Sequence, residues 1–231
     1  MERLLADPTL PAQVPLARMV DPAMTRAMVE TARWAVLSLH RGFFAYARQQ
    51  RQSLWQPFPQ RRADQVQVGV LGLGALGGAV AQDLRAAGYA VWGWRRSDGE
   101  APLRAQLPRT DIVVNLLPLT AQTRGFIDAH FLAQLPRGAN LVNLARGAHV
   151  VEADLLLALD SGRIGHAVLD VFQTEPLPAT HLFWQHPQVT VLPHAAALTD
   201  PQTASHVVAE NLRRLAAGEP LLHVVDRQRG Y

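Results

Sequence analysis

The sequence predicts an α/β protein built on a doubly wound parallel sheet with flanking helices. Short apolar segments alternate with helical patterns along most of the chain, which is typical of a parallel sheet. One of these apolar segments runs directly into a glycine-rich turn that opens a helix, Gly72-Leu73-Gly74-Ala75-Leu76-Gly77. The 231 residues are 48% hydrophobic, which is enough to bury one large core.

Each element is expected from its own local pattern. Apolar positions at steps of three and four from Pro22 predict a long helix running towards Arg48. The polar, aromatic and proline-broken segment 50–62 indicates an exposed arm. Strands are expected at 66–71, 89–94, 112–117, 141–145, 167–172 and 189–192. Helices between and after them are expected at 75–87, 128–135, 152–161 and 199–217.

Composition excludes several classes of protein. The formal net charge is only +3, so the sequence pI of about 10.1 reflects an excess of arginine without a dense basic tract, and no nucleic-acid partner is expected. The absence of cysteine excludes disulfides and cysteine-bound metal, and no metal site is expected. No apolar run reaches the roughly 18 residues that span a bilayer, and the first residues lack the pattern of a secretory signal. We therefore expect a soluble, cytoplasmic protein without a membrane partner.

The glycine turn has the order of residues that binds a dinucleotide. Gly72 would permit a tight turn, Gly74 would let the backbone approach a pyrophosphate, and Gly77 would let the helix pack on the strand. Amides at the start of the helix, including those of Ala75 and Leu76, would bind the phosphates. A merely glycine-lined turn is the alternative, which the flanking strand and helix disfavour. The sequence thus predicts a Rossmann-type cofactor site.

The end of the second strand indicates which dinucleotide binds. An NAD site would place an acid here, on the ribose hydroxyls. Instead Trp94 is followed by Arg95, Arg96 and Ser97, with no carboxylate among them. Two guanidiniums and a hydroxyl can bind a 2′-phosphate, so NADPH (NADP) is the expected cofactor and NADH the weaker alternative. The other interpretation is that both arginines only solvate a strand end.

Three short stretches each put a reactive side chain just beyond a strand end, where ligands bind in such sheets: the first offers Arg146, the second Asp170 and Glu175, and the third His194. An arginine, a carboxylate and a histidine suit the reduction of a 2-keto acid, as clamp, tuning acid and proton donor. Taken singly, Arg146 could be a strand cap, Glu175 a turn residue and His194 a core histidine. The remaining histidines are interpreted as structural or exposed: His40, His130, His149, His166, His181, His186, His206 and His223.

Together these motifs resemble the D-isomer-specific 2-hydroxyacid dehydrogenases, in particular their glyoxylate/hydroxypyruvate reductase A branch. The resemblance runs over nearly the whole chain. The segments that carry it are LWQPFP at 54–59, VGVLGLGALG at 68–77, NLLPLT at 115–120, NLARGAHVVEADLLLALDSG at 143–162, LDVFQTEPLP at 169–178, PHAAALT at 193–199 and VDRQRGY at 225–231.

The resemblance implies a role for each candidate residue. Arg146 would bind the substrate, His194 would be the acid/base, Glu175 its paired carboxylate, and Asp170 would lie beside the nicotinamide amide. Hydride transfer to the keto carbon would accompany proton donation by His194, while Glu175 favours the charged imidazolium. Glyoxylate would give glycolate, and hydroxypyruvate would give D-glycerate. Further cofactor contacts are expected from Leu117, Pro118, Thr123, Ala145 and Ala196.

Three domain segments and two departures from the family are expected. Residues 1–21 would be a remnant of a substrate domain, 22–193 the NAD(P)-binding domain with a dimer-forming helix and arm, and 194–231 a return to the substrate domain. The family's N-terminal stretch, with its carboxylate-holding glycine loop, is expected to be absent. The segment between Ser97 and Asp111 is too short for the family's strand and helix, so the third-strand edge of the sheet is expected to be lost.

Two functions therefore stay open at the level of the sequence. The first is an NADPH-dependent reductase of small 2-keto acids, acting as a homodimer. The second is an NADPH-binding module without turnover.

Overall fold

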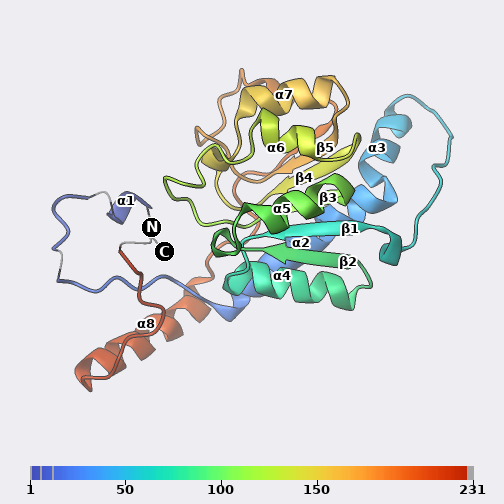
Figure 1. The fold of residues 1–231 in the computed structure, drawn as a ribbon. Coiled ribbons are helices and arrows are strands. Elements are labelled where there is room, and N and C mark those ends of the chain that lie inside the picture. The colour runs from blue at the N-terminus through green and yellow to red at the C-terminus, as the bar shows by residue number, and fades with distance from the viewer. Residues whose placement is uncertain (1, 6, 12, 228–231) are drawn as a thin grey trace.

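A six-stranded parallel sheet, ordered β2-β1-β3-β4-β5-β6, forms the centre of the protein (Figure 1). The structure is a computed structural model that describes residues 2–5, 7–11 and 13–227. The strands are β1 (Gln67–Leu71), β2 (Ala90–Trp94), β3 (Ile112–Asn115), β4 (Ala139–Asn143), β5 (Ile164–Leu169) and β6 (Val189–Val191). The predicted doubly wound α/β class is confirmed.

Helices lie on both faces of this sheet and beyond it. They are α1 (Glu2–Leu5), α2 (Pro22–Arg41), α3 (Phe43–Arg51), α4 (Ala75–Ala86), α5 (Glu100–Gln106), α6 (Ala129–Gln134), α7 (Glu152–Asp160) and α8 (Pro201–Ala216). Short 3-10 turns are η1 (Ala63–Gln65), η2 (Arg96–Asp98), η3 (Leu107–Arg109), η4 (Gly147–His149) and η5 (Leu182–Trp184).

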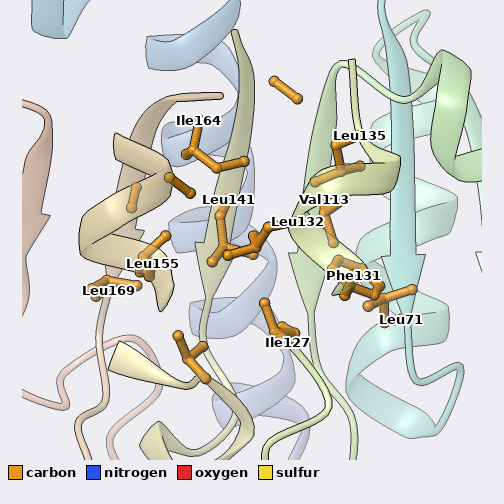
Figure 2. Packing of buried hydrophobic residues seen from close by; sticks show 14 of the residues in the cluster. Leu71, Val113, Ile127, Phe131, Leu132, Leu135, Leu141, Leu155, Ile164 and Leu169 are labelled. Carbon is orange, nitrogen blue, oxygen red and sulfur yellow. The ribbon is translucent and has the colours of Figure 1, made fainter. Parts of the chain in front are cut away.

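Two hydrophobic clusters, one on each face, hold the layers together. On one face α2 and α4 bury Ala32, Val36 and Val80 against the strands. On the other face α6 and α7 contribute Leu132 and Leu155, and Figure 2 shows them packed among strand residues. Because both faces are covered, strands such as β3 are buried along their whole length, as is usual in parallel sheets.

The long helix predicted from Pro22 towards Arg48 is confirmed only as far as Arg41, where α2 ends and a separate helix, α3, follows. Gly42 adopts a left-handed conformation with φ of 72°, and its amide donates to the carbonyl of Leu39 at 3.2 Å. This is a common way to end a helix, because glycine has no Cβ to oppose a positive φ. The chain changes direction there, so α3 and the following arm leave the line of α2.

Two strands lie two to three residues earlier than predicted. β4 ends at Asn143 and β5 at Leu169. The apolar pattern placed the start of each strand too late, because the polar residues Asn140 and His166 belong to these strands. Leu144, Ala145 and the segment 170–172 are therefore loop residues, which places the loops of Arg146 and Asp170 directly at the carboxyl ends of the strands.

The short connection after Ser97 gives β2 an edge position. In the usual order of such sheets a third strand lies outside the second, whereas here β2 is the outermost strand formed by the described residues, as expected from the short segment. A helix is nevertheless retained, since α5 buries Leu103 in the core. The indole of Trp94 donates to the carbonyl of Gly99 at 2.7 Å and ties this connection to β2.

The segments before α2 and after α8 lie side by side, away from the sheet (Figure 1). Ala17 and Val224 form an antiparallel bridge, and the amide of Val225 donates to the carbonyl of Leu16 at 2.7 Å. The last four residues of VDRQRGY lie outside the described part of the chain. None of the helices within 2–5, 7–11 and 13–227 is long and apolar enough to cross a membrane.

His166 on β5 is a buried titratable group that makes folding sensitive to pH. Its ring stacks on Phe44 with centroids 4.5 Å apart, and Nε2 lies 2.9 Å from the hydroxyl of Thr190. Nδ1 has no hydrogen-bond partner among the described residues. Burial, together with the positive charge of Arg48 and the nearby His186, lowers the pKa of His166 to about 4.

We expect the free energy of unfolding to fall as the pH drops. The unfolded chain binds a proton near the ordinary histidine pKa of 6.5, but the folded chain binds it only near 4, so stability is full above 6.5 and is lost towards 4. Denaturant titrations should show a loss of roughly 2 to 3 kcal/mol across this window. His166→Phe should remove most of this slope and the exposed control His130→Gln should keep it; an unchanged slope in His166→Phe would contradict the assignment.

Candidate active site

The glycine loop between β1 and α4 has the geometry predicted for its first and third glycines. Gly72 has φ of 92°, and a Cβ on it would lie 2.5 Å from the carbonyl oxygen of Leu116. A Cβ on Gly77 would overlap the carbonyl oxygen of Gly72, so α4 approaches the loop as closely as glycine allows. A Cβ on Gly74 would meet nothing within 4 Å, which leaves open space above the start of α4 and its first residues, Ala75 and Leu76.

Beside this loop, the turn after β2 presents the two arginines. Arg95, Arg96 and Ser97 are all exposed at the carboxyl end of the strand. Among the described residues neither guanidinium is paired with a carboxylate. No carboxylate occurs among these three residues, but the next residue, Asp98, places one close to them: its Oδ2 accepts from the Arg95 amide at 2.7 Å. Asp98 thus caps the turn through the backbone.

The loop after β3 carries the next predicted cofactor contacts. Leu117 is buried, and the hydroxyl of Thr123 donates to the carbonyl of Pro118 at 2.7 Å. The amide of Thr120 donates back to that hydroxyl at 2.8 Å. These bonds close the loop on itself. The amide of Leu116 donates to the carbonyl of Leu71 at 2.8 Å, which joins the loop to the residue just before the glycine turn.

Arg146 follows β4 and is exposed at the same edge of the sheet. Its guanidinium Nη1 donates to the carbonyl of the buried Ala145 at 2.7 Å. The next residue, Gly147, is buried, and a Cβ there would overlap the backbone of Phe172. The loop of Arg146 is therefore pressed against the loop that leads to Glu175.

His194 and Glu175 form a hydrogen-bonded pair. Nδ1 of His194 lies 2.7 Å from Oε2 of Glu175, and the other carboxylate oxygen accepts from the amide of Phe172 at 2.9 Å. Burial alone would raise the pKa of Glu175, but these two bonds and the positive charges of His194 and Arg146 hold it below its ordinary value. Glu175 is thus ionised at neutral pH and orients the imidazole.

Asp170 fixes the backbone that carries His194. His194 has a positive φ of 55°, unusual for a residue with a side chain, and its amide donates to the carbonyl of Asp170 at 2.9 Å. The carboxylate of Asp170 accepts from the amides of Ala195 at 2.7 Å and Ala196 at 3.1 Å. Burial raises the pKa of Asp170, and these amides oppose the rise. In the structure the carboxylate of Asp170 therefore holds the backbone that follows His194, a role in addition to the cofactor contact predicted for it.

The predicted site residues lie along one edge of the sheet, because the strands are parallel and each loop follows a carboxyl end. The printed bonds bring Glu175, Asp170 and His194 together, whereas Arg95 and Arg96 stand at the other side of the sheet, after β2.

The sequence interpretation missed the residues whose side chains connect the loops at this edge by hydrogen bonds. The buried side chains of Asn115 and Asn143 bond across β3 and β4 at 2.9 Å, and Thr31 donates to the carbonyl of Ala196 at 2.9 Å. The signal available in the sequence was an asparagine at the end of each of two successive apolar strands, which could have indicated a hydrogen bond between them.

Comparison with known proteins identifies the family. The model of the D-isomer specific 2-hydroxyacid dehydrogenase NAD-binding domain matches residues 33–196. The fold and site define a dinucleotide-binding dehydrogenase domain, and the chain belongs to the D-isomer-specific 2-hydroxyacid dehydrogenase family.

Three relatives are similar to this chain over nearly its whole length. It is 46% identical over 232 residues to glyoxylate/hydroxypyruvate reductase A of Klebsiella pneumoniae strain 342, covering 96% of this chain and 74% of the relative. A family member from Xanthobacter autotrophicus Py2, solved with NADPH and MES, is 41% identical with a TM-score of 0.94, covering 100% of this chain and 99% of that one. The NADPH-dependent glyoxylate/hydroxypyruvate reductase of Sinorhizobium meliloti, solved with NADP and sulfate, is 40% identical with a TM-score of 0.95, covering 100% and 77%.

Proposed function

We propose that this protein is an NADPH-dependent reductase that converts glyoxylate to glycolate and hydroxypyruvate to D-glycerate. The observation that carries the proposal is the hydrogen-bonded pair of His194 and Glu175, at the same sheet edge as Arg146 and the glycine loop. Family membership and the names of the relatives support the same reaction class.

The residues present fit a dinucleotide phosphate. Space above Gly74 leaves room for the pyrophosphate at the first amides of α4. The exposed guanidiniums of Arg95 and Arg96 suit the 2′-phosphate, and the exposed Ser97 follows them in the chain. Bound NADPH would supply the hydride that the keto carbon accepts.

The chain's own side chains would handle the substrate and the proton. Arg146 binds the carboxylate of the keto acid and polarises its carbonyl oxygen. Since Nδ1 of His194 faces Glu175, its Nε2 is the atom left to give a proton to that oxygen. The carbon gains a hydride and the oxygen a proton, which yields the 2-hydroxy acid.

Cofactor preference is the first expected result. NADPH should bind about tenfold to a hundredfold more tightly than NADH, the range expected for charge-assisted bonds to a phosphate. Fluorescence titration with both nucleotides measures this ratio. Arg96→Asp should narrow or reverse the preference, and Arg85→Asp, on the far part of α4, should preserve it. Equal affinities for the two nucleotides in the wild-type protein would refute the assignment.

A homodimer is the second expected result. The arm exposes large apolar side chains that a partner would bury, with Trp55 97% and Leu54 48% exposed, and α2 exposes Trp34 at 41%. Light scattering should give twice the monomer mass at micromolar concentration. Trp55→Ser should shift the protein towards monomer; a wild-type protein that is monomeric under these conditions rules the dimer out.

Domain division and location remain predictions. The bridge between Ala17 and Val224 supports placing 1–21 and 194–231 in one unit, apart from the cofactor-binding residues 22–193. Of the residues in α8 only Ala204 is buried, in keeping with a helix that leaves the core. A cytoplasmic location is proposed from the composition alone.

A further inference from the structure

A buried chain of hydrogen bonds joins the loops after β3 and β4. The side-chain amide of Asn115 donates to Oδ1 of Asn143 at 2.9 Å, and Oδ1 of Asn115 accepts from the amide of Leu117 at 3.2 Å. The side-chain amide of Asn143 then donates to the carbonyl of Arg146 at 3.1 Å. The side chains of Asn115 and Asn143 are at most about 1% exposed, so the bond between them is shielded from water.

His149 closes this chain on its far side. The side chain is fully buried, with Nδ1 3.1 Å from the carbonyl oxygen of Arg146 and Nε2 3.3 Å from the carbonyl oxygen of Pro118. The backbone amide of His149 donates to the same Arg146 carbonyl at 3.2 Å. The ring therefore bridges the loop of Arg146 and the loop of Pro118 directly.

The proton on this ring decides which loop is tied more firmly. A neutral imidazole has one N–H, so it donates to one of the two carbonyls. The carbonyl of Pro118 also accepts from Thr123 at 2.7 Å, and the carbonyl of Arg146 also accepts from Asn143 and from the backbone amide of His149, so other donors are present on both sides. The contact from Nδ1 is the shorter of the two that the ring makes. We take the shorter contact as the donated one, which puts the proton on Nδ1 and the bond on the carbonyl of Arg146.

Two contacts restrain the backbone of the loop that carries Arg146. Gly147 lies so close to Phe172 that a Cβ would overlap its backbone, which blocks one direction of movement. His149 adds a second restraint, since its buried ring contacts the carbonyl of Arg146 at 3.1 Å. A guanidinium that must meet a carboxylate in two places gains from such a fixed backbone.

We propose that His149 is a positioning residue for Arg146: its ring holds the Arg146 carbonyl against the Pro118 loop and thereby sets the direction of the guanidinium. The inference rests on the proposed function, because it takes Arg146 as the group that binds the substrate carboxylate. His149 itself touches neither substrate nor cofactor in this role.

Three substitutions separate the two contacts of the ring. Asn at position 149 places a donor where Nδ1 stands, Gln places one nearer to Nε2, and Leu removes both. The probe is oxamate, a carboxylate that cannot accept hydride, titrated into the NADPH-bound protein. His149→Leu and His149→Gln should weaken oxamate binding about tenfold, and His149→Asn less than about threefold. NADPH affinity, measured separately, should stay near the wild-type value in all three.

Two outcomes overturn the proposal. If all three variants bind oxamate as the wild type does and lose only stability, His149 is structural; if His149→Asn is as weak as His149→Leu, the Nδ1 contact does not position Arg146. A wild-type protein that binds NADPH but no oxamate removes the proposed function as well, which distinguishes the two failures.

A measurement on the wild type covers the case in which the variants do not fold. With ¹⁵N-labelled histidine, the Nδ1 proton of His149 should exchange slowly with water and its NMR signal should move when oxamate is added. A rapidly exchanging proton, or a signal that oxamate leaves in place, contradicts the proposal.

Discussion

Replacing His194 with glutamine should lower kcat for glyoxylate by about 10² to 10⁴, the usual contribution of a positioned general acid. Glutamine keeps a polar group of similar length but has no proton to give at neutral pH. NADPH affinity should stay within about twofold of the wild type, because His194 acts on the substrate oxygen and lies apart from the turn that carries Arg95 and Arg96. Steady-state kinetics and fluorescence titration measure the two quantities.

The structure offers a matched control for this substitution. His206 is exposed on α8 and lies outside the site, so His206→Gln should leave both kcat and NADPH affinity unchanged. Should His194→Gln retain more than about a tenth of the wild-type kcat, another group must donate the proton. A simultaneous collapse of NADPH binding would show instead that the substitution disturbs the fold around Asp170 and Ala195.

Two adjacent glycines in α4 should respond in opposite ways to the same added methyl group. In Gly77→Ala the new Cβ meets the carbonyl of Gly72, whose own amide is held by the carbonyl of Trp94 at 2.8 Å. Either α4 or the loop must shift, and overpacking of this kind costs about 1 to 3 kcal/mol. Because the loop is the proposed pyrophosphate site, we expect NADPH affinity to fall about tenfold to a hundredfold.

Gly78→Ala is the control, since a Cβ there meets nothing within 4 Å. Alanine is the better helix former, so Gly78→Ala should be neutral or raise the free energy of unfolding by up to about 1 kcal/mol. Thermal unfolding and NADPH titration of both variants provide the comparison. If Gly77→Ala binds NADPH as the wild type does, the close approach of α4 to the loop has no part in cofactor binding.

Local patterns predicted all six strands, two of them displaced by two to three residues, and the glycine turn. Apolar runs such as β3 are buried on both faces, and the spacing of Gly72, Gly74 and Gly77 corresponds to a definite backbone geometry. The break at Gly42 was not predicted, because the apolar positions continue past it at helical spacing while the glycine turns the chain. Glycine within a helical pattern is thus weak evidence in either direction.

Tertiary contacts account for the parts of the site that sequence could not reveal. Asp170 was predicted beside the cofactor, and the structure shows its carboxylate occupied by the amides of Ala195 and Ala196. His149 was interpreted as structural or exposed; it is fully buried, which fits the structural interpretation, and it contacts two site loops that the sequence did not bring together. Both roles depend on which loops meet at the sheet edge, which no single segment encodes.

Consumption of NADPH by the wild-type protein tests the central proposal most directly. Loss of the absorbance of reduced nicotinamide should begin when glyoxylate or hydroxypyruvate is added to protein and NADPH, and the rate should saturate with each acid. The reaction should be slower with NADH at equal concentration, and glycolate or D-glycerate should accumulate in step with NADPH oxidation. Saturable NADPH binding without any consumption in the presence of either acid would contradict the proposal and leave a cofactor-binding module without turnover.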